Sequence, residues 1–85
     1  MVLEKTHKVI LVNDDSNNFD YVMACLIRYC DHDPVQAEQA ALIAHHNGKC
    51  DVASGSFNEM YDLMDRLQSL ALVAEIGDYE GNMYK

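Results

Sequence analysis

The sequence predicts a single α+β domain in which three helices pack on one face of a small, mostly antiparallel three-stranded sheet. Three observations predict this fold class. An apolar run near the N-terminus is typical of a buried strand, three later stretches repeat apolar residues every 3.6 positions, and residues 69–76 show a two-residue period. The resulting order is β-α-α-β-α-β, without a Gly-rich crossover. A chain of 85 residues with 49% apolar content suits one domain with a small core.

The first strand is expected at residues 7–12 and ends in a polar turn. Its residues 9–12 (VILV) are apolar and mostly β-branched, as in buried strands. The following residues are Asn13, Asp14 and Asp15, which tolerate turn geometry and bond their own backbone. These residues leave two interpretations open: a simple exit turn, or a rigid strand end that presents three acceptors to a cation.

The first helix is expected from Phe19, with Asn17 or Asn18 as its N-cap. Its apolar residues follow a helical period: Phe19, Val22, Met23, Leu26, Ile27 and Cys30.

A second helix is expected from Pro34 to Asn47, because Asp33 is a good N-cap and Gly48 a good C-terminal stop. His45 borders its inner face. The residues of that face are all small: Ala37, Ala40, Ala41 and Ala44. Such a face either lies close to a neighbouring element or leaves room for something else.

A second strand is expected at residues 50–53. Ser56 and Glu59 form a capping box before a third helix that starts near Phe57. The period-two stretch 69–76 is the last expected strand. We therefore expect a flexible N-terminal lead at residues 1–6, a folded domain at 7–76 and a loose C-terminal tail at 77–85.

Composition argues against several classes of function. The net charge of −8 disfavours nucleic acid and anionic membranes as partners, because both would repel this surface. Three cysteines without a CxxC pair indicate a reduced cytosolic compartment rather than a disulfide scaffold. No segment suits a signal peptide or a membrane span. GxSxG, HExxH and P-loop motifs are absent from the sequence, so we expect neither an enzyme nor a cofactor.

A metal site is also not expected. The adjacent residues His45 and His46 do not converge on a helix, and Cys50 lacks a paired ligand. Cys25 and Cys30 fall on or near the apolar face of the first helix, which favours a packing role.

A polar cluster beside a gap remains. If the second helix packs beside the first strand, His45 can approach Asn13 and the two carboxylates, and together they would suit an ammonium group. The space beside them would be left by Ala41 and Ala44 and walled by Leu11, Phe19 and Val22. The alternative is that His45 is a hydrogen-bonded histidine at the edge of the core.

Residues 8–15 (KVILVNDD), the helix from Phe19, and His45 followed by Gly48-Lys49 resemble the ClpS family. The resemblance extends over about residues 7–76. Members of this family are non-enzymatic adaptors that carry N-degron substrates to the Clp AAA+ unfoldase-protease.

The resemblance implies that the chain binds proteins whose first residue is Leu, Phe, Tyr or Trp. The free α-amino group would be held by Asn13, Asp14, Asp15 and His45. The side chain would enter a pocket formed by Leu11, Val12, Asn17, Phe19, Val22, Ala41, Ala44 and Leu72. A second surface, which includes Glu59, would dock on the N-terminal domain of a ClpA- or ClpC-type unfoldase that feeds ClpP. The resemblance further implies a monomer in the cytoplasm, or in the plastid stroma of a photosynthetic eukaryote.

Two departures from the family pattern affect specificity. Many relatives have Thr-Pro-Met at residues 17–19, where this chain has Asn-Asn-Phe, and often carry Met and Val in place of Ala41 and Ala44. The smaller residues should widen the pocket unless Phe19 turns in to fill the space. We expect Phe, Tyr and Trp to be preferred over Leu. The lead before the first strand is also short, which leaves open a chain that binds degrons yet delivers them poorly. A separate alternative is a module that docks on the Clp N-domain without productive degron binding.

Overall fold

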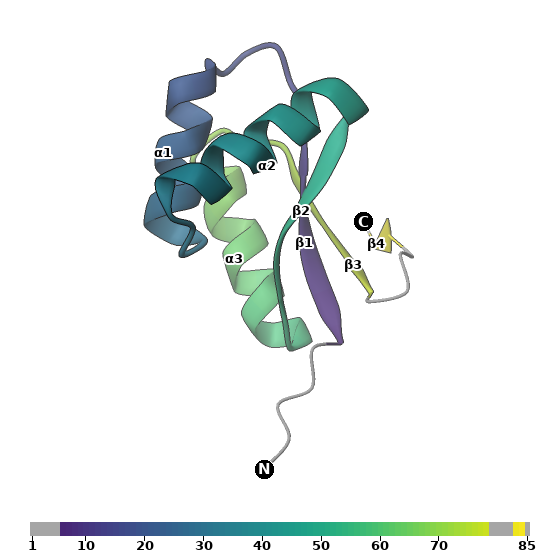
Figure 1. The fold of residues 1–85 in the computed structure, drawn as a ribbon. Helices are drawn as coiled ribbons and strands as arrows, with labels where there is room; N and C mark the ends of the chain where they lie inside the picture. Colours follow the sequence, from purple (N-terminus) through teal and green to yellow (C-terminus); the bar gives the residue numbers. More distant parts are fainter. Residues whose placement is uncertain (1–5, 79–82, 85) are drawn as a thin grey trace.

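The computed structural model describes residues 6–78 and 83–84 (Figure 1). Its elements follow the expected β-α-α-β-α-β order, and one short strand is added after them. The elements are β1 (His7–Val12), α1 (Phe19–Tyr29), α2 (Pro34–Asn47), β2 (Lys49–Gly55), α3 (Phe57–Ser69), β3 (Ala74–Asp78) and β4 (Met83–Tyr84). The fold class is confirmed. Residues 1–5 of the expected lead, and residues 79–82 and 85 of the expected tail, lie outside the described residues.

The sheet has the strand order β2-β1-β3-β4, and all neighbouring strands are antiparallel. The three helices lie on the same side of it in Figure 1. Helix α3 packs on β1 and β3, α2 packs on β2, and α1 packs mainly on α2. The central strand β1 sends Val9 and Leu11 into the core beneath the helices, since alternate residues of a strand share a face.

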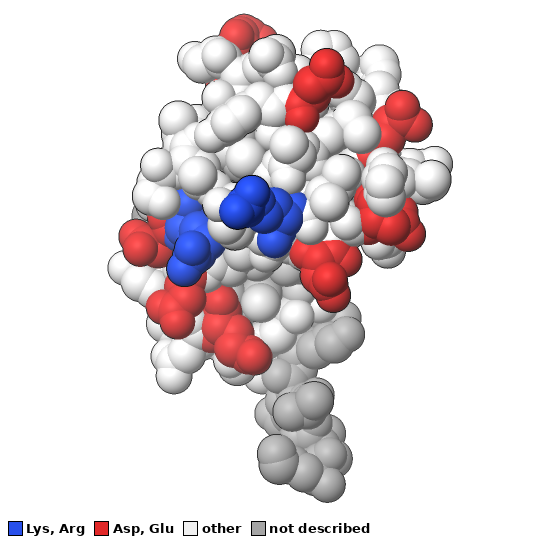
Figure 2. All heavy atoms as spheres, turned by 90° about the vertical axis from the view of Figure 1, so that its left-hand side faces the viewer, with Lys and Arg blue, Asp and Glu red and all other residues white. Residues whose placement is uncertain are grey.

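Helices α1 and α3 also meet at the ring of Tyr29. The guanidinium groups of Arg28 and Arg66 lie 5.8 and 5.7 Å from its centroid, within the range of a cation–π interaction. Figure 2 shows the basic side chains on this side of the molecule gathered in one place, with acidic side chains around them.

The helix ends follow the expected caps. The side chain of Asn18, not of Asn17, accepts the hydrogen bond of the Tyr21 N–H at 2.7 Å. Capping boxes open α2 at Asp33 and α3 at Ser56, and Gly48 ends α2 with a φ of 93°. These local interactions fix where each helix begins, because they satisfy N–H groups that have no partner inside the helix.

The last strand begins later than expected. The prediction of a strand over residues 69–73 is wrong, because α3 runs to Ser69 and a turn follows. In this turn Ala71 adopts a φ of 69°, and the Leu72 N–H donates back to the Leu67 carbonyl at 3.1 Å. The burial pattern that suggested a strand is nevertheless real, since Leu72 is buried.

Two further differences extend the sheet. Strand β2 spans seven residues, Lys49–Gly55, and is longer than expected because its pairing with β1 continues past a bulge next to Val9 and Ile10. Strand β3 continues to Asp78, and the two residues of β4 pair with it inside the segment expected as a tail.

Candidate functional site

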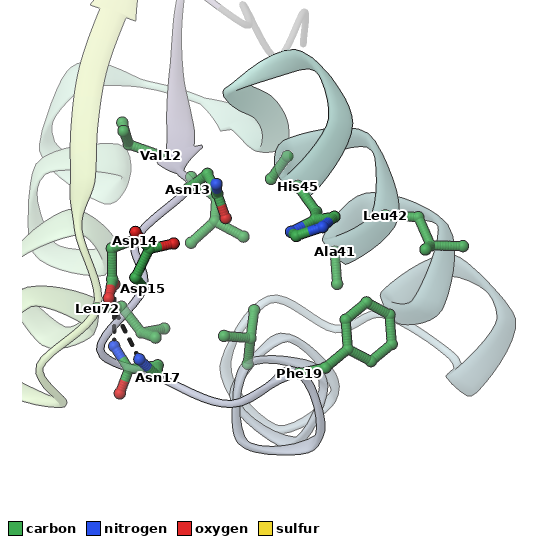
Figure 3. A pocket seen from close by; sticks show the side chains of 13 residues that line it. Val12, Asn13, Asp14, Asp15, Asn17, Phe19, Ala41, Leu42, His45 and Leu72 are labelled. Carbon is green, nitrogen blue, oxygen red and sulfur yellow. Dashed lines mark hydrogen bonds between the residues drawn. The ribbon is translucent and has the colours of Figure 1, made fainter.

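A pocket of about 400 Å³ opens where β1 ends, between the loop that follows it, α1 and α2 (Figure 3). This volume is typical of small-ligand sites, which occupy roughly 300–1,000 Å³. The structure brings the twelve residues proposed for the α-amino and side-chain sites around this one pocket, together with Leu42. The lining residues are Leu11, Val12, Asn13, Asp14, Asp15, Asn17, Phe19, Val22, Ala41, Leu42, Ala44, His45 and Leu72. Their roles remain predictions.

Asn13 and His45 form the polar side of the pocket, and their side chains point into the same space in Figure 3. A backbone hydrogen bond explains this proximity. The Asn13 N–H donates to the Gly48 carbonyl at 2.8 Å and ties the end of β1 to the end of α2. Since His45 lies in the last turn of α2, the same bond brings its imidazole to the strand end.

His45 is an exposed residue and not a hydrogen-bonded histidine of the core edge. Its ring meets the ring of His46 edge-on, with 5.3 Å between centroids. Within residues 6–78, no hydrogen bond or ion pair to its ring nitrogens is found. The imidazole can therefore bond to a ligand in the pocket without giving up a partner in the protein.

Asp14 and Asp15 differ in their surroundings although they are adjacent. The carboxylate of Asp14 turns to the loop, where it accepts hydrogen bonds from the Ser16 and Asn17 N–H groups and from the Asn17 side chain. The Asn17 side-chain bond, followed by the Ser16 backbone bond, lowers the pKa of Asp14 below its ordinary value of 3.8. Asp15 is exposed, and no such bond involves its side chain in the described part of the chain.

The apolar side of the pocket has a buried base and an open rim. Leu11 and Leu72 form the base and are 3% and 4% exposed, whereas Phe19 at the rim is 38% exposed. Ala41 and Ala44 line the pocket from α2. Their small side chains leave the hollow open, because a larger residue at either position would occupy its volume.

Leu42 lines the rim and was missed from the sequence, where only the alanine face of the second helix was considered. It is 42% exposed and lies three residues before His45. Residues three apart on a helix are neighbours on its surface, so this spacing was the signal that could have identified it.

Glu59 lies apart from the pocket, in the first turn of α3. Its carboxylate completes the capping box and accepts hydrogen bonds from the Ser56 hydroxyl and N–H at 3.0 and 3.4 Å. The first helical residue, Phe57, contacts His7 at the start of β1, with 5.0 Å between ring centroids. The length of β1 therefore separates this region from the pocket at its other end.

The three cysteines are poorly suited to act as nucleophiles, because each is buried or has surroundings that disfavour the thiolate. Cys25 is buried, and burial raises the pKa of the Cys30 thiol to about 11. Burial and the nearby Asp51 also raise the pKa of Cys50. Over the described ranges, 6–78 and 83–84, no group of three His, Cys, Asp or Glu side chains is placed to hold a metal ion. None of the helices in these ranges has the length and apolar character needed to cross a membrane.

The geometry is that of a site for a cationic group attached to an apolar one. Asn13, Asp15 and His45 offer acceptors on one side, and the other side is apolar and buried at its base. The net charge of −8 adds a field that favours a positively charged ligand.

Comparisons with known proteins bear on this arrangement. Residues 3–76 match the sequence model of the family described as ATP-dependent Clp protease adaptor protein ClpS. The fold is similar to the solved structure of Agrobacterium tumefaciens ClpS2 bound to L-phenylalaninamide, with a TM-score of 0.75 and 19% sequence identity. That match covers 87% of this chain and 96% of the other, and it shows a shared fold. A comparison with curated proteins gave no match.

Proposed function

The chain belongs to the ClpS family of adaptor proteins for the ATP-dependent Clp protease, and from this premise we propose that its pocket binds N-degrons. The ligand is the first residue of a protein chain with a free α-amino group and a bulky apolar side chain. Asn13, Asp15 and His45 accept hydrogen bonds from the ammonium group, and the side chain enters the hollow beside Ala41 and Ala44. The chain acts as a non-enzymatic carrier.

The observation that carries this proposal is that acceptors and an apolar hollow share one pocket. L-Phenylalaninamide, the ligand of the Agrobacterium protein, combines a free amine with an aromatic side chain. Its amide group stands where the peptide bond to a second residue would be. A ligand of this chemistry matches both sides of the pocket described here.

Physical estimates agree with specific but reversible binding. Each charge-assisted hydrogen bond to the ammonium group contributes roughly 1.5–3 kcal/mol. Burial of a large apolar side chain adds roughly 1.5–3 kcal/mol. Association itself has an unfavourable free energy. After this is subtracted, we expect a binding free energy of about −8 kcal/mol, which corresponds to a micromolar dissociation constant.

The shape of the hollow favours aromatic first residues. Next to Ala41 and Ala44 the hollow is wide, so the side chain of a first-residue Leu would fill it only partly. The ring of Phe19 at the rim can pack against an aromatic ring of the ligand. We therefore propose that Phe, Tyr and Trp bind more tightly than Leu. Equal affinity for otherwise identical Phe- and Leu-first peptides would contradict this preference.

Peptide binding tests the proposed function directly. A labelled peptide with a free N-terminal Phe should bind, and its N-acetylated form should not, because acetylation removes the charge. His45→Ala should weaken binding of the free peptide by at least about tenfold, the loss expected for a charge-assisted hydrogen bond.

His46→Ala is the matched control. His46 lies beside His45 on α2 but does not line the pocket. Its substitution should leave the affinity unchanged. Equal binding of the free and acetylated peptides, or equal losses in the two histidine variants, would contradict the proposal and favour a docking module without degron recognition.

The proposal includes a second surface, because an adaptor must contact the protease while it carries cargo. We place it around Glu59, at the end of β1 that lies away from the pocket. Phe57 and Tyr61 are 44% and 49% exposed there and stack with 5.8 Å between their ring centroids. Its partner would be the N-terminal domain of a ClpA- or ClpC-type unfoldase, in the cytoplasm or the plastid stroma.

Binding to purified ClpA and ClpC N-terminal domains tests this surface. Tyr61→Ser should weaken docking and leave peptide binding intact. Val35→Ala removes an exposed apolar side chain at the start of α2 and serves as the control. Equal docking by the wild type and Tyr61→Ser would place the contact elsewhere on the molecule.

A further inference from the structure

The turn that joins α3 to β3 is held by side chains from another part of the chain. The Tyr21 hydroxyl on α1 donates to the Leu70 carbonyl at 2.6 Å. The Asn17 side-chain amide donates to the Ala71 carbonyl at 2.8 Å. Because Ala71 has a φ of 69°, a conformation that non-glycine residues rarely adopt, the turn needs such contacts to persist.

Asn17 uses both hydrogens of its amide. One bonds to the Ala71 carbonyl and the other to the Asp14 carboxylate, at 2.8 and 3.0 Å. The amide therefore connects the loop after β1 with the turn after α3, and each of these segments is followed by or contains residues that line the pocket.

Leu72 follows this turn immediately and lies at the base of the pocket, where it is 4% exposed. Beyond it, the Val12 N–H donates to the Val73 carbonyl at 2.9 Å. The backbone of Leu72 is thus fixed on its C-terminal side by β1, and on its N-terminal side by the bonds from Tyr21 and Asn17.

We propose that Tyr21 and Asn17 are positioning residues for cargo recognition, which hold the 70–71 turn so that Leu72 forms the base of the pocket. This inference rests on the proposed function. Tyr21 does not line the pocket, so it acts on a ligand only through the turn. Partial desolvation and the neighbouring Cys25 raise the pKa of Tyr21, so its hydroxyl remains a donor at neutral pH.

A single hydroxyl group tests the proposal. Tyr21→Phe removes the donor and keeps the ring. It should weaken binding of a free-amine Phe-first peptide about two- to tenfold, the effect of one net hydrogen bond. Binding is measured at a temperature well below the Tm of every variant, so that a loss of stability alone does not change the affinity.

Tyr29→Phe is the matched control on the same helix. In the described part of the chain no hydrogen bond to the Tyr29 hydroxyl is found, so its removal should leave the affinity unchanged. Methyl NMR of the free protein gives an independent readout. In Tyr21→Phe the methyl signals of Leu72 should shift, whereas those of Val9, fully buried in the core on β1, should stay in place.

The outcomes separate this inference from the proposed function. Unchanged affinity and unchanged Leu72 signals in Tyr21→Phe would overturn it. Shifts of Val9 as large as those of Leu72 would show a general loosening of the fold and would also overturn it. If the wild type binds no Phe-first peptide, the proposed function fails, and the Leu72 signals alone decide whether Tyr21 positions the turn.

Discussion

The side-chain amide of Asn17 donates a hydrogen bond to the carboxylate of Asp14, with 3.0 Å between Nδ2 and Oδ2. The other carboxylate oxygen accepts the Ser16 and Asn17 N–H groups at 2.6 and 3.2 Å. An Asp that bonds the backbone two and three residues ahead organises a turn. Asp14 therefore shapes the loop, whereas the adjacent Asp15 carboxylate is exposed and available to a ligand.

Asp14 should make the stability of the fold depend on pH. Its pKa is lowered in the folded state by the Asn17 and Ser16 hydrogen bonds, so its contribution to the free energy of unfolding is complete above the ordinary value of 3.8. The contribution is lost as the pH falls through the lower folded pKa. Urea unfolding of the wild type and Asp14→Asn should show a stability difference at neutral pH that shrinks below about pH 4. A difference that stays constant down to about pH 3 would contradict this role.

Asp15 should matter for binding rather than for stability. Asp15→Asn keeps the shape of the side chain and removes the charge that faces a ligand ammonium group. The affinity for a free-amine Phe-first peptide should fall roughly ten- to hundredfold, the equivalent of one charge-assisted hydrogen bond. Fluorescence anisotropy measures this loss, and the Tm should stay near that of the wild type. A larger loss of affinity in Asp14→Asn than in Asp15→Asn would reverse the assignment.

The sequence was sufficient for those elements that depend on local interactions. Helix periods and caps such as Asp33 and Ser56 act within a few residues, so they predict where helices begin. The turn at Ala71 could not be predicted this way. The side chains that bond to this turn, Tyr21 and Asn17, lie about fifty residues earlier in the chain. The alternating apolar pattern of this stretch also predicts a strand and gives no sign of the left-handed backbone at Ala71.

The site was predicted only in outline. The strand end and the alanine face of α2 indicated which residues could surround a pocket, and the family resemblance named Leu72 from a distant segment. The sequence could not distinguish Asp14 from Asp15, because the difference lies in which carboxylate turns toward the loop. Leu42 was missed because an exposed leucine between small residues carries no clear signal until the pocket is formed.

The width of the hollow should depend on Ala41. This residue is 6% exposed, lines the pocket and lies outside the main core cluster. Ala41→Met should therefore fill the hollow with little effect on packing elsewhere. Phe- and Trp-first peptides should lose about tenfold in affinity, while Leu-first peptides lose less. A group that does not fit an apolar pocket weakens binding by roughly 1–3 kcal/mol.

A matched substitution outside the pocket controls for the added methionine. Ala24→Met places the same side chain at an exposed position of α1. Its affinities for all peptides should equal those of the wild type, measured by the same titrations. Equal losses for Phe- and Leu-first peptides in Ala41→Met would show that width does not set the preference.

Thiol labelling separates the adaptor from a redox- or thiol-dependent enzyme. The attacking species in labelling is the thiolate, and a thiol with a pKa of about 11, as at Cys30, is ionised in only about one molecule in a thousand at pH 8. Cys25 is buried, so a reagent reaches it only when the fold opens. We therefore expect slow labelling of both in the native protein and fast labelling in urea.

Cys50 is partly exposed and should react before Cys25 and Cys30, but more slowly than a free cysteine because its pKa is raised. Mass spectrometry of the labelled peptides assigns each rate. If a thiol of the native protein reacted faster than free cysteine, its surroundings would have to activate it. A non-enzymatic adaptor does not need an activated thiol, so this result would favour the enzyme.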